Sequence, residues 1–500
     1  MTLRDLYLLS PEMAMAALAS LVVLVDLVVP RTRVLATLAG VGLLVPAALS
    51  VLLWGEVGGE ASGAVTALSG TLVVDEFSLF FKFLVLGIVG LLIPASVDYV
   101  GRFLRSPGEF YALVLFSATG MMLLASTTEL VSIYISLELT SLPLAVLAAF
   151  LRDGRSSEAG LKFLLLSALS SAILLYGMVL VYGVTGSTRL EEIAQEVARV
   201  TAGGGPLFQG PVVLVGVALM VAGFGFKVAS VPFQMWVPDV YEGAPTPVTA
   251  YLSVGSKAAG FAVLLRVFYV ALQGEELRAD WGGLFAVLSV ASMTAGNLMA
   301  MLQGNIKRLL AYSTVAHAGY LLVGLAVVAG GGGAGEALLG PSGVLFYLGA
   351  YAASNLAAFF AIIVITNQVG SDQISAFAGM ARRAPWLAAA LALAMVSLIG
   401  IPPTAGFMGK LYLFNAAVQN GMAWLALAGV VNSVVSAYYY LRVVRSMYLL
   451  PAESDEPVRA SAPMVAALAV PVLGVLLLGV LPNLLLEVAQ SAVGTIQPPG

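Results

Sequence analysis

The chain lacks cysteine, has a single histidine and contains few charged residues. Of its 500 residues only 10% are charged, against about 25% in ordinary soluble proteins. Without cysteine and with one histidine, it has no ligand set for an iron–sulfur cluster, a Cys/His zinc site or a bis-histidine haem. The net charge of −4 gives no sign of a nucleic-acid partner. We therefore expect no metal or cofactor in this chain, and any associated redox chemistry in another subunit.

Apolar residues make up 60% of the chain, compared with roughly 45–50% in soluble proteins. A soluble fold of this length cannot hide so much apolar surface, so membrane lipids are expected to surround most of it. The N-terminus has no short positive-then-apolar signal pattern with a small-residue cleavage site, so its first apolar run is predicted to be a retained helix. The sequence thus predicts an all-α polytopic membrane protein.

The apolar runs are long enough for about fourteen transmembrane helices, since each crossing needs about 20 mainly apolar residues. Numbered in chain order, spans 7 and 12 are longer than a simple crossing requires and contain internal glycine and proline. The predicted spans are 7–29, 33–54, 76–97, 109–126, 128–150, 158–184, 211–242, 246–273, 281–302, 309–330, 342–368, 385–419, 421–450 and 461–490.

The basic residues between the spans support this count. Of 23 Lys and Arg residues, 17 lie at or beyond the ends of the predicted spans. Thirteen of these follow odd-numbered spans, whereas four lie on the other side. Because Lys and Arg accumulate on the cytoplasmic face, both termini are predicted to be periplasmic in a bacterial inner (plasma) membrane. Between the spans, 185–210 contains a charged stretch that suits an amphipathic surface helix, and 330–335 suits a flexible tether.

Four ionisable side chains fall well inside predicted spans, where a charge costs a few kcal/mol. Glu138 lies in IYISLELTSLP, Lys227 in VAGFGFKVASVP, Lys257 in YLSVGSKAAGFA and Lys410 in IGIPPTAGFMGKLYLF. A packing hydrogen bond is the alternative for Glu138. A lysine buried in an apolar medium titrates below its solution pKa of about 10.4, so these lysines are candidates for proton-holding sites.

Other ionisable residues in or at the spans allow two interpretations each. A lone histidine is more often a satisfied core residue than a functional one, but the mid-span position of His317 favours function. Lys162 lies one turn inside its span and suits either function or snorkelling to the surface. Glu109 is either a helix N-terminal charge or a point of proton uptake. Lys82 and Arg266 lie near outer span ends, where snorkelling is expected.

Glycine and proline interrupt spans 7 and 12 at matching places. In lipid, such breaks persist only where protein or water satisfies the freed backbone groups, and paired breaks are the best sequence pointer to a transporter's ion path. The residues of these breaks are Pro232 in span 7 and Gly400, Pro402, Pro403 and Gly406 in span 12.

The two breaks also share a short sequence echo, in which 223–227 and 406–410 each place a lysine four residues after a glycine. The breaks are five spans apart, and a repeat of odd span number is inserted upside-down. Spans 4–8 and 9–13 are therefore predicted to be inverted repeats, in which Glu138 corresponds to His317. The predicted units are 1–100 (helices 1–3), 101–278 (first repeat), 279–450 (second repeat) and 451–500 (helix 14).

Three long motifs resemble the antiporter-like membrane subunits of respiratory complex I. They are VPDVYEGAPTPVTAYLSVGSKAAGFA (237–262), NIKRLLAYSTVAHAGY (305–320) and SLIGIPPTAGFMGKLYLF (397–414), and the resemblance extends over nearly the whole chain. Among these subunits the chain is most similar to the NuoN-type (NdhB-like) subunit. One sister subunit typically has glutamate where this chain has Lys410.

The resemblance implies a proton-translocating subunit of an NADH:quinone oxidoreductase, with no redox chemistry in this chain. It implies that Glu138 and Lys227 form a coupling pair, that Lys257 and His317 relay protons, and that Lys410 is the terminal lysine. Lys162 would be a minor relay member. FMN, iron–sulfur clusters and quinone would lie in partner subunits. The expected neighbours are antiporter-like and small membrane subunits and the lateral helix of a distal sister subunit, a helix that this chain is expected to lack.

Two other functions are compatible with the same residues. An Mrp-like cation/proton antiporter subunit shares this architecture but has no redox partner. A non-pumping membrane scaffold would anchor an assembly without transport, but a scaffold has no need for charges at mid-span and at helix breaks. The sequence has no carboxylate- and carbonyl-rich pattern that favours sodium over protons.

Overall fold

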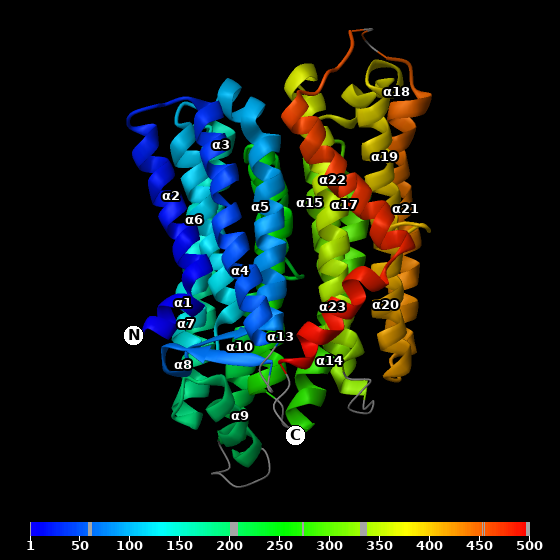
Figure 1. Cartoon of the computed structure of the whole chain (residues 1–500). Helices are drawn as coiled ribbons and strands as arrows, with labels where there is room; N and C mark the ends of the chain where they lie inside the picture. The colour runs from blue at the N-terminus through cyan, green and yellow to red at the C-terminus, as the bar shows by residue number, and fades with distance from the viewer. Residues whose placement is uncertain are drawn as a thin grey trace.

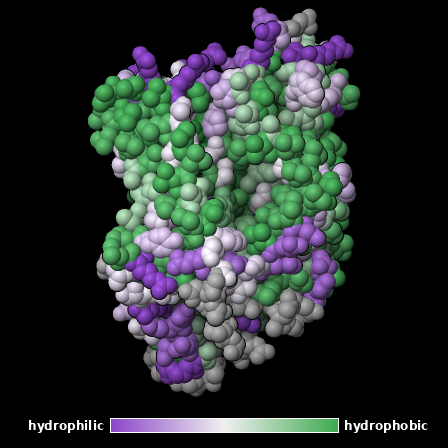
Figure 2. All heavy atoms as spheres, in the orientation of Figure 1, coloured by the Kyte–Doolittle hydropathy of each residue, from purple (hydrophilic) through white to green (hydrophobic). Residues whose placement is uncertain are grey.

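The computed structural model describes residues 2–58, 63–200, 209–272, 275–330, 338–452, 454 and 456–496. Long helices run side by side along one axis (Figure 1). A belt of apolar surface separates two polar ends (Figure 2). Among the described residues, 12 helices are long and apolar enough to cross a membrane. The prediction of an all-α polytopic membrane protein is therefore confirmed.

The N-terminal part has a small β-hairpin that the sequence did not predict. It joins α4 to α5 through an antiparallel pairing of Ala67 with Leu72 and of Ala64 with Asp75. The elements are α1 (Leu3–Leu8), α2 (Ser10–Asp26), α3 (Thr32–Gly42), α4 (Leu44–Val57), β1 (Ala64–Ala67), η1 (Leu68–Gly70), β2 (Leu72–Asp75) and α5 (Glu76–Phe103).

The segment predicted as the first repeat contains a broken helix and two π-helical turns. Its elements are α6 (Pro107–Ser126), α7 (Leu130–Ala148), α8 (Gly154–Thr185), α9 (Leu190–Arg199), α10 (Gln209–Val228), η3 (Gln234–Trp236), α11 (Val237–Gly243), α12 (Thr246–Tyr251), η4 (Leu252–Ser256), α13 (Lys257–Arg266) and η5 (Val267–Ala271).

The remainder of the chain contains the second broken helix and the C-terminal helices. Its elements are α14 (Glu275–Met301), α15 (Ile306–Ala326), η6 (Val327–Gly330), α17 (Leu339–Val369), η7 (Ile374–Phe377), α18 (Met380–Arg383), α19 (Pro385–Ile399), α20 (Ala405–Gln419), α21 (Ala423–Leu449), α22 (Ala462–Val480) and α23 (Asn483–Gly494).

Several predicted elements differ in detail from the structure. Predicted spans 1 and 12 correspond to the 17-residue helix α2 and to the pair α19 and α20, so the number fourteen stays a prediction. Predicted span 14 (461–490) was wrong as a single helix: it divides at Leu481 and Pro482, because proline cannot donate the next helical hydrogen bond. The surface helix in 185–210 is confirmed as α9. The predicted tether at 330–335 falls almost wholly outside the described residues.

The two ends of the chain lie at the same end of the molecule. The backbone N–H of Leu68, beside the hairpin, donates to Asp5 at 2.9 Å. The hydroxyl of Ser491, in α23, donates to Glu76 at the start of α5. Figure 1 shows α1 and α23 at this end. This arrangement agrees with the prediction that both termini face one side, whereas the identity of that side stays a prediction.

Two loop pairs with the same hydrogen-bond pattern match the predicted repeats. The residue before α7 forms an antiparallel bridge with the residue before α9, Glu129 with Arg189. The residue before α15 forms the same bridge with the residue before η7, Asn305 with Gln373. In each case the preceding helix, α8 or α17, ends in a left-handed glycine.

These matched loops lie at opposite ends of the molecule. The first loop pair lies at the hairpin before α5, where Arg189 donates to the Ser69 carbonyl at 2.8 Å. The second lines a cavity together with Phe103, the last residue of α5. In addition, α6 packs on α7 as α14 packs on α15, and α8 packs on both half-helices α10 and α11 as α17 packs on both half-helices α19 and α20. Inverted repeats place their matched loops at opposite ends of the molecule and pack their matched helices in the same way, and both features are present.

Two buried ion pairs join the N-terminal helices to each other and to the first repeat. Lys82 of α5 lies 2.8 Å from Glu12 of α2, and both side chains are at most 3% exposed. Arg266 of α13 contacts both oxygens of Asp75 at 2.9 Å and the Ala125 carbonyl. The prediction that Lys82 and Arg266 snorkel was therefore wrong. Their distance from the span ends is short, but acidic partners from other helices hold them inside.

We expect the Lys82→Met variant to destabilise the assembled protein by about 3–5 kcal/mol, because it leaves the Glu12 carboxylate buried without its cation. The double variant Glu12→Gln/Lys82→Met removes both charges and should recover most of the loss. Thermal unfolding of the purified membrane complex measures both. A double variant no more stable than Lys82→Met would contradict this account.

Candidate functional site

Lys227 occupies the end of α10, where it faces α7. Its side chain is 8% exposed and its ammonium donates to the hydroxyl of Ser141. Glu138, one turn earlier on α7, has a buried carboxylate oxygen without a hydrogen-bond partner. Among the described residues, no ion pair within 4.0 Å joins Glu138 to Lys227. Both members of the predicted coupling pair thus lie next to Ser141. Glu138 is one turn away from it on α7, and Lys227 donates to its hydroxyl.

Protein groups satisfy the backbone that the break after α10 frees. Beyond Val228 the chain leaves the helix at Ala229, whose φ is +64°. The Trp236 indole donates to the Phe226 carbonyl at 3.1 Å, and the Val231 N–H donates to the Ser292 hydroxyl at 2.9 Å. Pro232 has no N–H to satisfy. The break therefore persists in an apolar surrounding because side chains replace the missing helical bonds.

Lys257 lies at the centre of the molecule, directly after the π-helical turn η4. It is 2% exposed, donates to the Thr314 carbonyl of α15 at 2.5 Å and lies 4.8 Å above the Tyr351 ring. A Cβ on Gly260, three residues further along α13, would lie 3.6 Å from the Cβ of Lys227. The helix α13, which carries Lys257, thus contacts the Lys227 site through Gly260 and α15 and α17 through Lys257.

His317 is held by tyrosine hydroxyls on both ring nitrogens. Nδ1 lies 2.6 Å from the Tyr347 hydroxyl of α17, and Nε2 lies 3.1 Å from the Tyr440 hydroxyl of α21. The Tyr440 hydroxyl is also hydrogen-bonded to Ser313. Because α15, α17 and α21 each contribute a side chain, this arrangement exists only in the folded second half.

Lys410 binds the end of the broken helix α19. Its ammonium donates to the carbonyls of Leu398 at 3.1 Å and Ile399 at 2.8 Å, and it lies 4.4 Å above the Tyr320 ring. These carbonyls are freed because the chain turns at Gly400, whose φ is +89°. A cation at a helix C-terminus is stabilised by the helix dipole. The break therefore provides the binding site for the lysine.

The sequence echo between 223–227 and 406–410 has no structural counterpart. Lys227 lies in the half-helix before its break, and Lys410 lies in the half-helix after its break. The two lysines therefore do not occupy equivalent positions, because the echo compares opposite sides of the two breaks. The repeat itself is supported by the matched loops and helix packing described above.

Lys162 belongs to a charged network on the polar end of the molecule, opposite the termini. It contacts Glu158 and Asp239, each at 2.7 Å. Arg308 bridges Asp239 at 2.8 Å and Glu242 at 3.0 Å. The network thus fastens α11 to α8 and α15.

Lys162 is 40% exposed, which agrees with the snorkelling interpretation. Glu109 lies at the start of α6, is 57% exposed and faces Arg152 at 3.9 Å. Among the described residues, no hydrogen bond connects either side chain to the buried lysines. Lys162 and Glu109 are therefore candidates only for the part of a proton path that lies at the protein surface.

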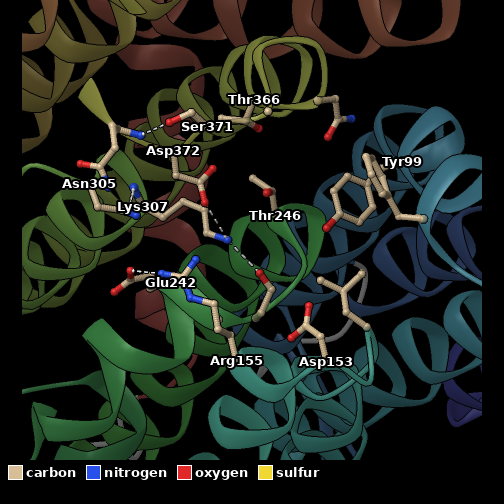
Figure 3. Close-up of a pocket in the computed structure, with 17 residues that line it drawn as sticks. Tyr99, Asp153, Arg155, Glu242, Thr246, Asn305, Lys307, Thr366, Ser371 and Asp372 are labelled. Atoms are coloured by element: carbon tan, nitrogen blue, oxygen red, sulfur yellow. Dashed lines mark hydrogen bonds and ion pairs between the residues drawn. The ribbon is translucent and has the colours of Figure 1, made fainter. Parts of the chain in front are cut away.

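A cavity of about 380 Å³ opens beside this network (Figure 3). Its lining includes Asp153, Thr246 and Asp372. It also includes Lys307, which the sequence placed among the loop charges. Lys307 is buried and donates to the Ala244 carbonyl at 2.9 Å, with Asp372 at 3.7 Å. Lys307 lies two residues after Asn305, whose side chain caps α15, and this asparagine was the sequence signal that Lys307 lies in the first turn of that helix.

The sequence reasoning missed the tyrosines. Tyr347, Tyr351 and Asn355 recur at four-residue spacing along α17, so they share one helix face. The Tyr351 hydroxyl is hydrogen-bonded to Thr314 at 2.9 Å and accepts from Asn355 at 3.1 Å. This spacing was visible in the sequence, but nothing indicated that the face points at His317.

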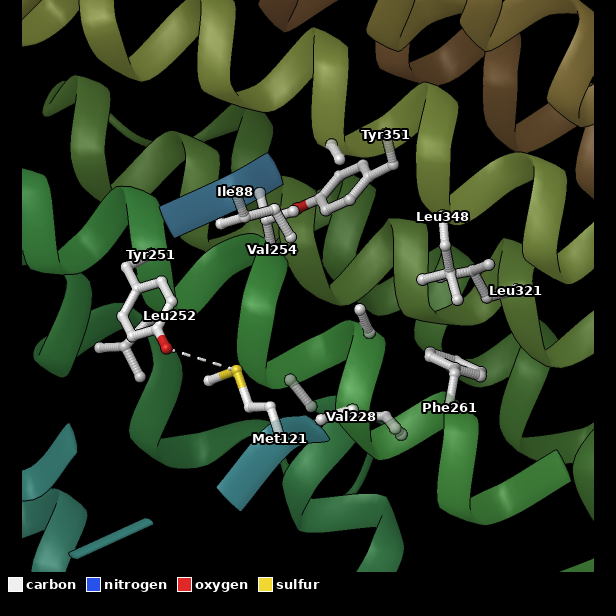
Figure 4. Close-up of a cluster of buried hydrophobic side chains, with 14 of the residues drawn as sticks. Ile88, Met121, Val228, Tyr251, Leu252, Val254, Phe261, Leu321, Leu348 and Tyr351 are labelled. Atoms are coloured by element: carbon white, nitrogen blue, oxygen red, sulfur yellow. Dashed lines mark hydrogen bonds between the residues drawn. The ribbon is translucent and has the colours of Figure 1, made fainter. Parts of the chain in front are cut away.

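Apolar side chains form a buried cluster in the interior of the bundle. Val228, Val254 and Phe261 pack together with Leu348 around the centre of the molecule (Figure 4). Within this apolar core, hydrogen bonds to hydroxyls and backbone carbonyls hold the ionisable side chains.

These features define a class: multi-pass membrane proteins with two broken helices and a buried line of Glu, Lys and His across the interior. Residues 127–436 match the sequence profile of the family described as NADH:quinone oxidoreductase/Mrp antiporter, TM. The subunit N of NADH-quinone oxidoreductase from Dehalococcoides mccartyi is 45% identical over 98% of this chain and 99% of its own length. The corresponding protein of Moorella thermoacetica is 44% identical over 99% and 100%.

Solved structures agree. A chain of respiratory complex I from Thermus thermophilus with bound aureothin is 34% identical and superposes with a TM-score of 0.77, covering 95% of this chain and 98% of that one. A chain of the Mrp complex from Dietzia sp. DQ12-45-1b has the same fold, with a TM-score of 0.85 at 23% identity and coverage of 100% and 98%. The chain belongs to the NADH-quinone oxidoreductase subunit N family.

Gly406→Ala should displace Lys410, because a Cβ at this position would lie 1.9 Å from the Ser397 carbonyl oxygen and push α20 away from α19. We expect loss of proton pumping by the complex or failure of the subunit to assemble. Gly87→Ala is the matched control, since its Cβ would meet no atom within 4 Å. Normal pumping by Gly406→Ala would contradict the close approach of the two half-helices.

Proposed function

We propose that this chain is a proton-translocating membrane-arm subunit of an NADH:quinone oxidoreductase in the bacterial plasma membrane. Family membership and likeness to a chain of a solved respiratory complex I support this assignment. Redox chemistry with FMN, iron–sulfur clusters and quinone takes place in partner subunits. This chain moves protons and is a translocase subunit without a redox step of its own.

The observation that carries the proposal is the inward placement of the ionisable groups in the apolar spans. Lys227, Lys257, His317 and Lys410 are each at most 8% exposed, and none of these four side chains faces the lipid. Burial of so many ionisable groups is costly, and a protein retains them when they act. Their hydrogen-bond partners come from different helices, so the packed bundle positions all four.

The first step of the mechanism is electrostatic. In this structure Lys227 contacts Ser141 rather than Glu138. If the Glu138 carboxylate approached to 4 Å, the pair would gain roughly 4 kcal/mol at an effective dielectric of 20. That energy changes the proton affinity of the lysine by about a thousandfold. Movement of Glu138 toward or away from Lys227 would therefore load or unload the lysine.

The second step carries the proton across the molecule. Lys257 contacts α15 through Thr314, and His317 lies one turn further along that helix. Lys410 then receives the proton at the carbonyl end of α19, where the helix dipole favours its charged form. Release of the proton to the outer side follows from Lys410, the terminal lysine of the path.

We also propose how this chain is oriented in the membrane, which subunits contact it and where its two repeats lie. Both termini face the periplasm, and the basic end with the cavity faces the cytoplasm. The repeats are 101–278 and 279–450. The neighbours are antiporter-like and small membrane subunits, and the lateral helix of a distal sister subunit lies against this chain.

A cation/proton antiporter subunit is the second candidate, because the Mrp chain shares the fold. At 23% identity this likeness concerns architecture alone. The identities of 44–45% to subunit N proteins over nearly the whole chain favour the oxidoreductase. A non-pumping scaffold remains a further alternative that the pumping experiment tests.

We expect Lys227→Ala to lower the proton-to-electron ratio of the intact complex, because the lysine that Glu138 controls is absent. The measurement is proton uptake into proteoliposomes during NADH oxidation. Arg199→Ala is the control, since Arg199 lies at the surface of α9 and contacts Glu196. A ratio equal to that of the wild type would remove this subunit from the pumping path.

A tagged copy of this chain should co-purify in mild detergent with flavin- and iron–sulfur-containing subunits that oxidise NADH. The physical reason is that the chain has no ligand set for redox centres, so its energy source must be bound to it. Absorbance spectra and NADH oxidation by the purified material measure this. Purification of the chain with membrane subunits alone would favour the antiporter.

A further inference from the structure

We propose that the hydroxyls of Tyr347 and Tyr440 carry the proton to and from His317, as members of a hydrogen-bonded chain that links the Lys257 side to the Lys410 side. The inference rests on the proposed function and specifies how the proton crosses the second half of the molecule.

The chain is continuous through four side chains. Ser313 is hydrogen-bonded to Tyr440, whose hydroxyl lies 3.1 Å from Nε2 of His317. Nδ1 of the same ring lies 2.6 Å from the Tyr347 hydroxyl. A neutral imidazole donates from one nitrogen and accepts at the other, so it continues a hydrogen-bonded chain in either tautomer. All four side chains are buried.

The two ends of the chain adjoin residues that contact or neighbour the two lysines. Ser313 precedes Thr314, whose carbonyl accepts from Lys257 at 2.5 Å. At the other end, a Cβ on Gly409 would lie 2.5 Å from the Tyr347 ring, so this ring packs directly against the residue before Lys410. The chain therefore runs from the neighbourhood of one lysine to that of the other.

The transfer needs no charged tyrosine. When a proton arrives at Ser313, each hydroxyl accepts one proton and gives up the one it held, and Nε2 gains a proton while Nδ1 passes its own to Tyr347. One proton leaves the Lys257 side, one reaches the Lys410 side, and every intermediate group ends neutral. The hydroxyls then rotate and the imidazole exchanges its tautomer before the next transfer. No oxidant or reductant takes part.

A structural role is the alternative, in which the tyrosines only orient the imidazole. The two roles differ in additivity. If the tyrosines are members of one serial relay, either substitution alone interrupts it, so a second substitution adds little to the effect of the first. Independent packing contacts on α17 and α21 would instead add their effects. The roles also differ in chemistry, because orientation depends on shape and hydrogen bonding and transfer depends on the acidity of the phenol.

The experiment uses the intact complex in proteoliposomes, with proton uptake measured during NADH oxidation. We expect Tyr347→Phe and Tyr440→Phe each to slow proton-coupled turnover by about tenfold or more, and the double variant to be no more than about twofold slower than either. Tyr251→Phe is the matched control. Its hydroxyl is buried and donates to the Val114 carbonyl at 3.3 Å, but it contacts no member of the chain.

A second measurement covers the case in which a phenylalanine variant fails to assemble. A fluorinated tyrosine at position 347 keeps the hydroxyl but makes the phenol more acidic, and we expect it to shift the pH dependence of pumping. The same substitution at position 251 should not. An unshifted profile at both positions would overturn the relay.

The outcomes for the two proposals are distinguishable. If both phenylalanine variants pump like the wild type while Lys227→Ala does not, the tyrosine relay is overturned and the proposed function stands. If Lys227→Ala also pumps normally, the proposed function fails as well. Additive slowing by the two phenylalanine variants, with no effect of fluorination, would assign the tyrosines a structural role and overturn the relay.

Discussion

An ionised side chain in a hydrocarbon medium must find a partner inside the protein, and this requirement organises the whole bundle. Lys82 meets a carboxylate of another helix, Arg266 meets the carboxylate of Asp75 at the end of β2, and Lys410 meets the open carbonyls of a broken helix. Lys257 has only a backbone carbonyl and an aromatic face. The cations that are paired with carboxylates hold elements of the bundle together, and the proposed function assigns proton exchange to lysines whose partners are neutral.

The helix breaks follow from the same requirement. A proline or a left-handed glycine within a span frees carbonyls, which lipid cannot satisfy. In the first half the Trp236 indole and Ser292 hydroxyl bind the freed backbone, so this break is closed by fixed neutral groups. In the second half Lys410 binds the carbonyls itself. The two breaks are therefore alike in position within the repeat but different in chemistry.

The interior combines apolar packing with narrow polar bridges. Valine, phenylalanine and leucine side chains such as Val228, Phe261 and Leu348 belong to one buried apolar cluster (Figure 4). Hydroxyl groups on α15, α17 and α21 provide the bridges around His317. Since hydroxyls both donate and accept, the relay that we propose would transmit a proton without the cost of a further buried charge.

The sequence alone determined the membrane environment, the helical fold, the two broken helices and the ionisable residues, because composition, hydrophobic length and proline are properties of local segments. Only the tertiary structure decided which buried charges are paired, that the echo at Lys227 and Lys410 compares opposite sides of the breaks, and that tyrosines enclose His317. Those contacts join helices far apart in the chain. Local pattern sets where a helix lies, but the packing of one helix on another sets which side chains meet.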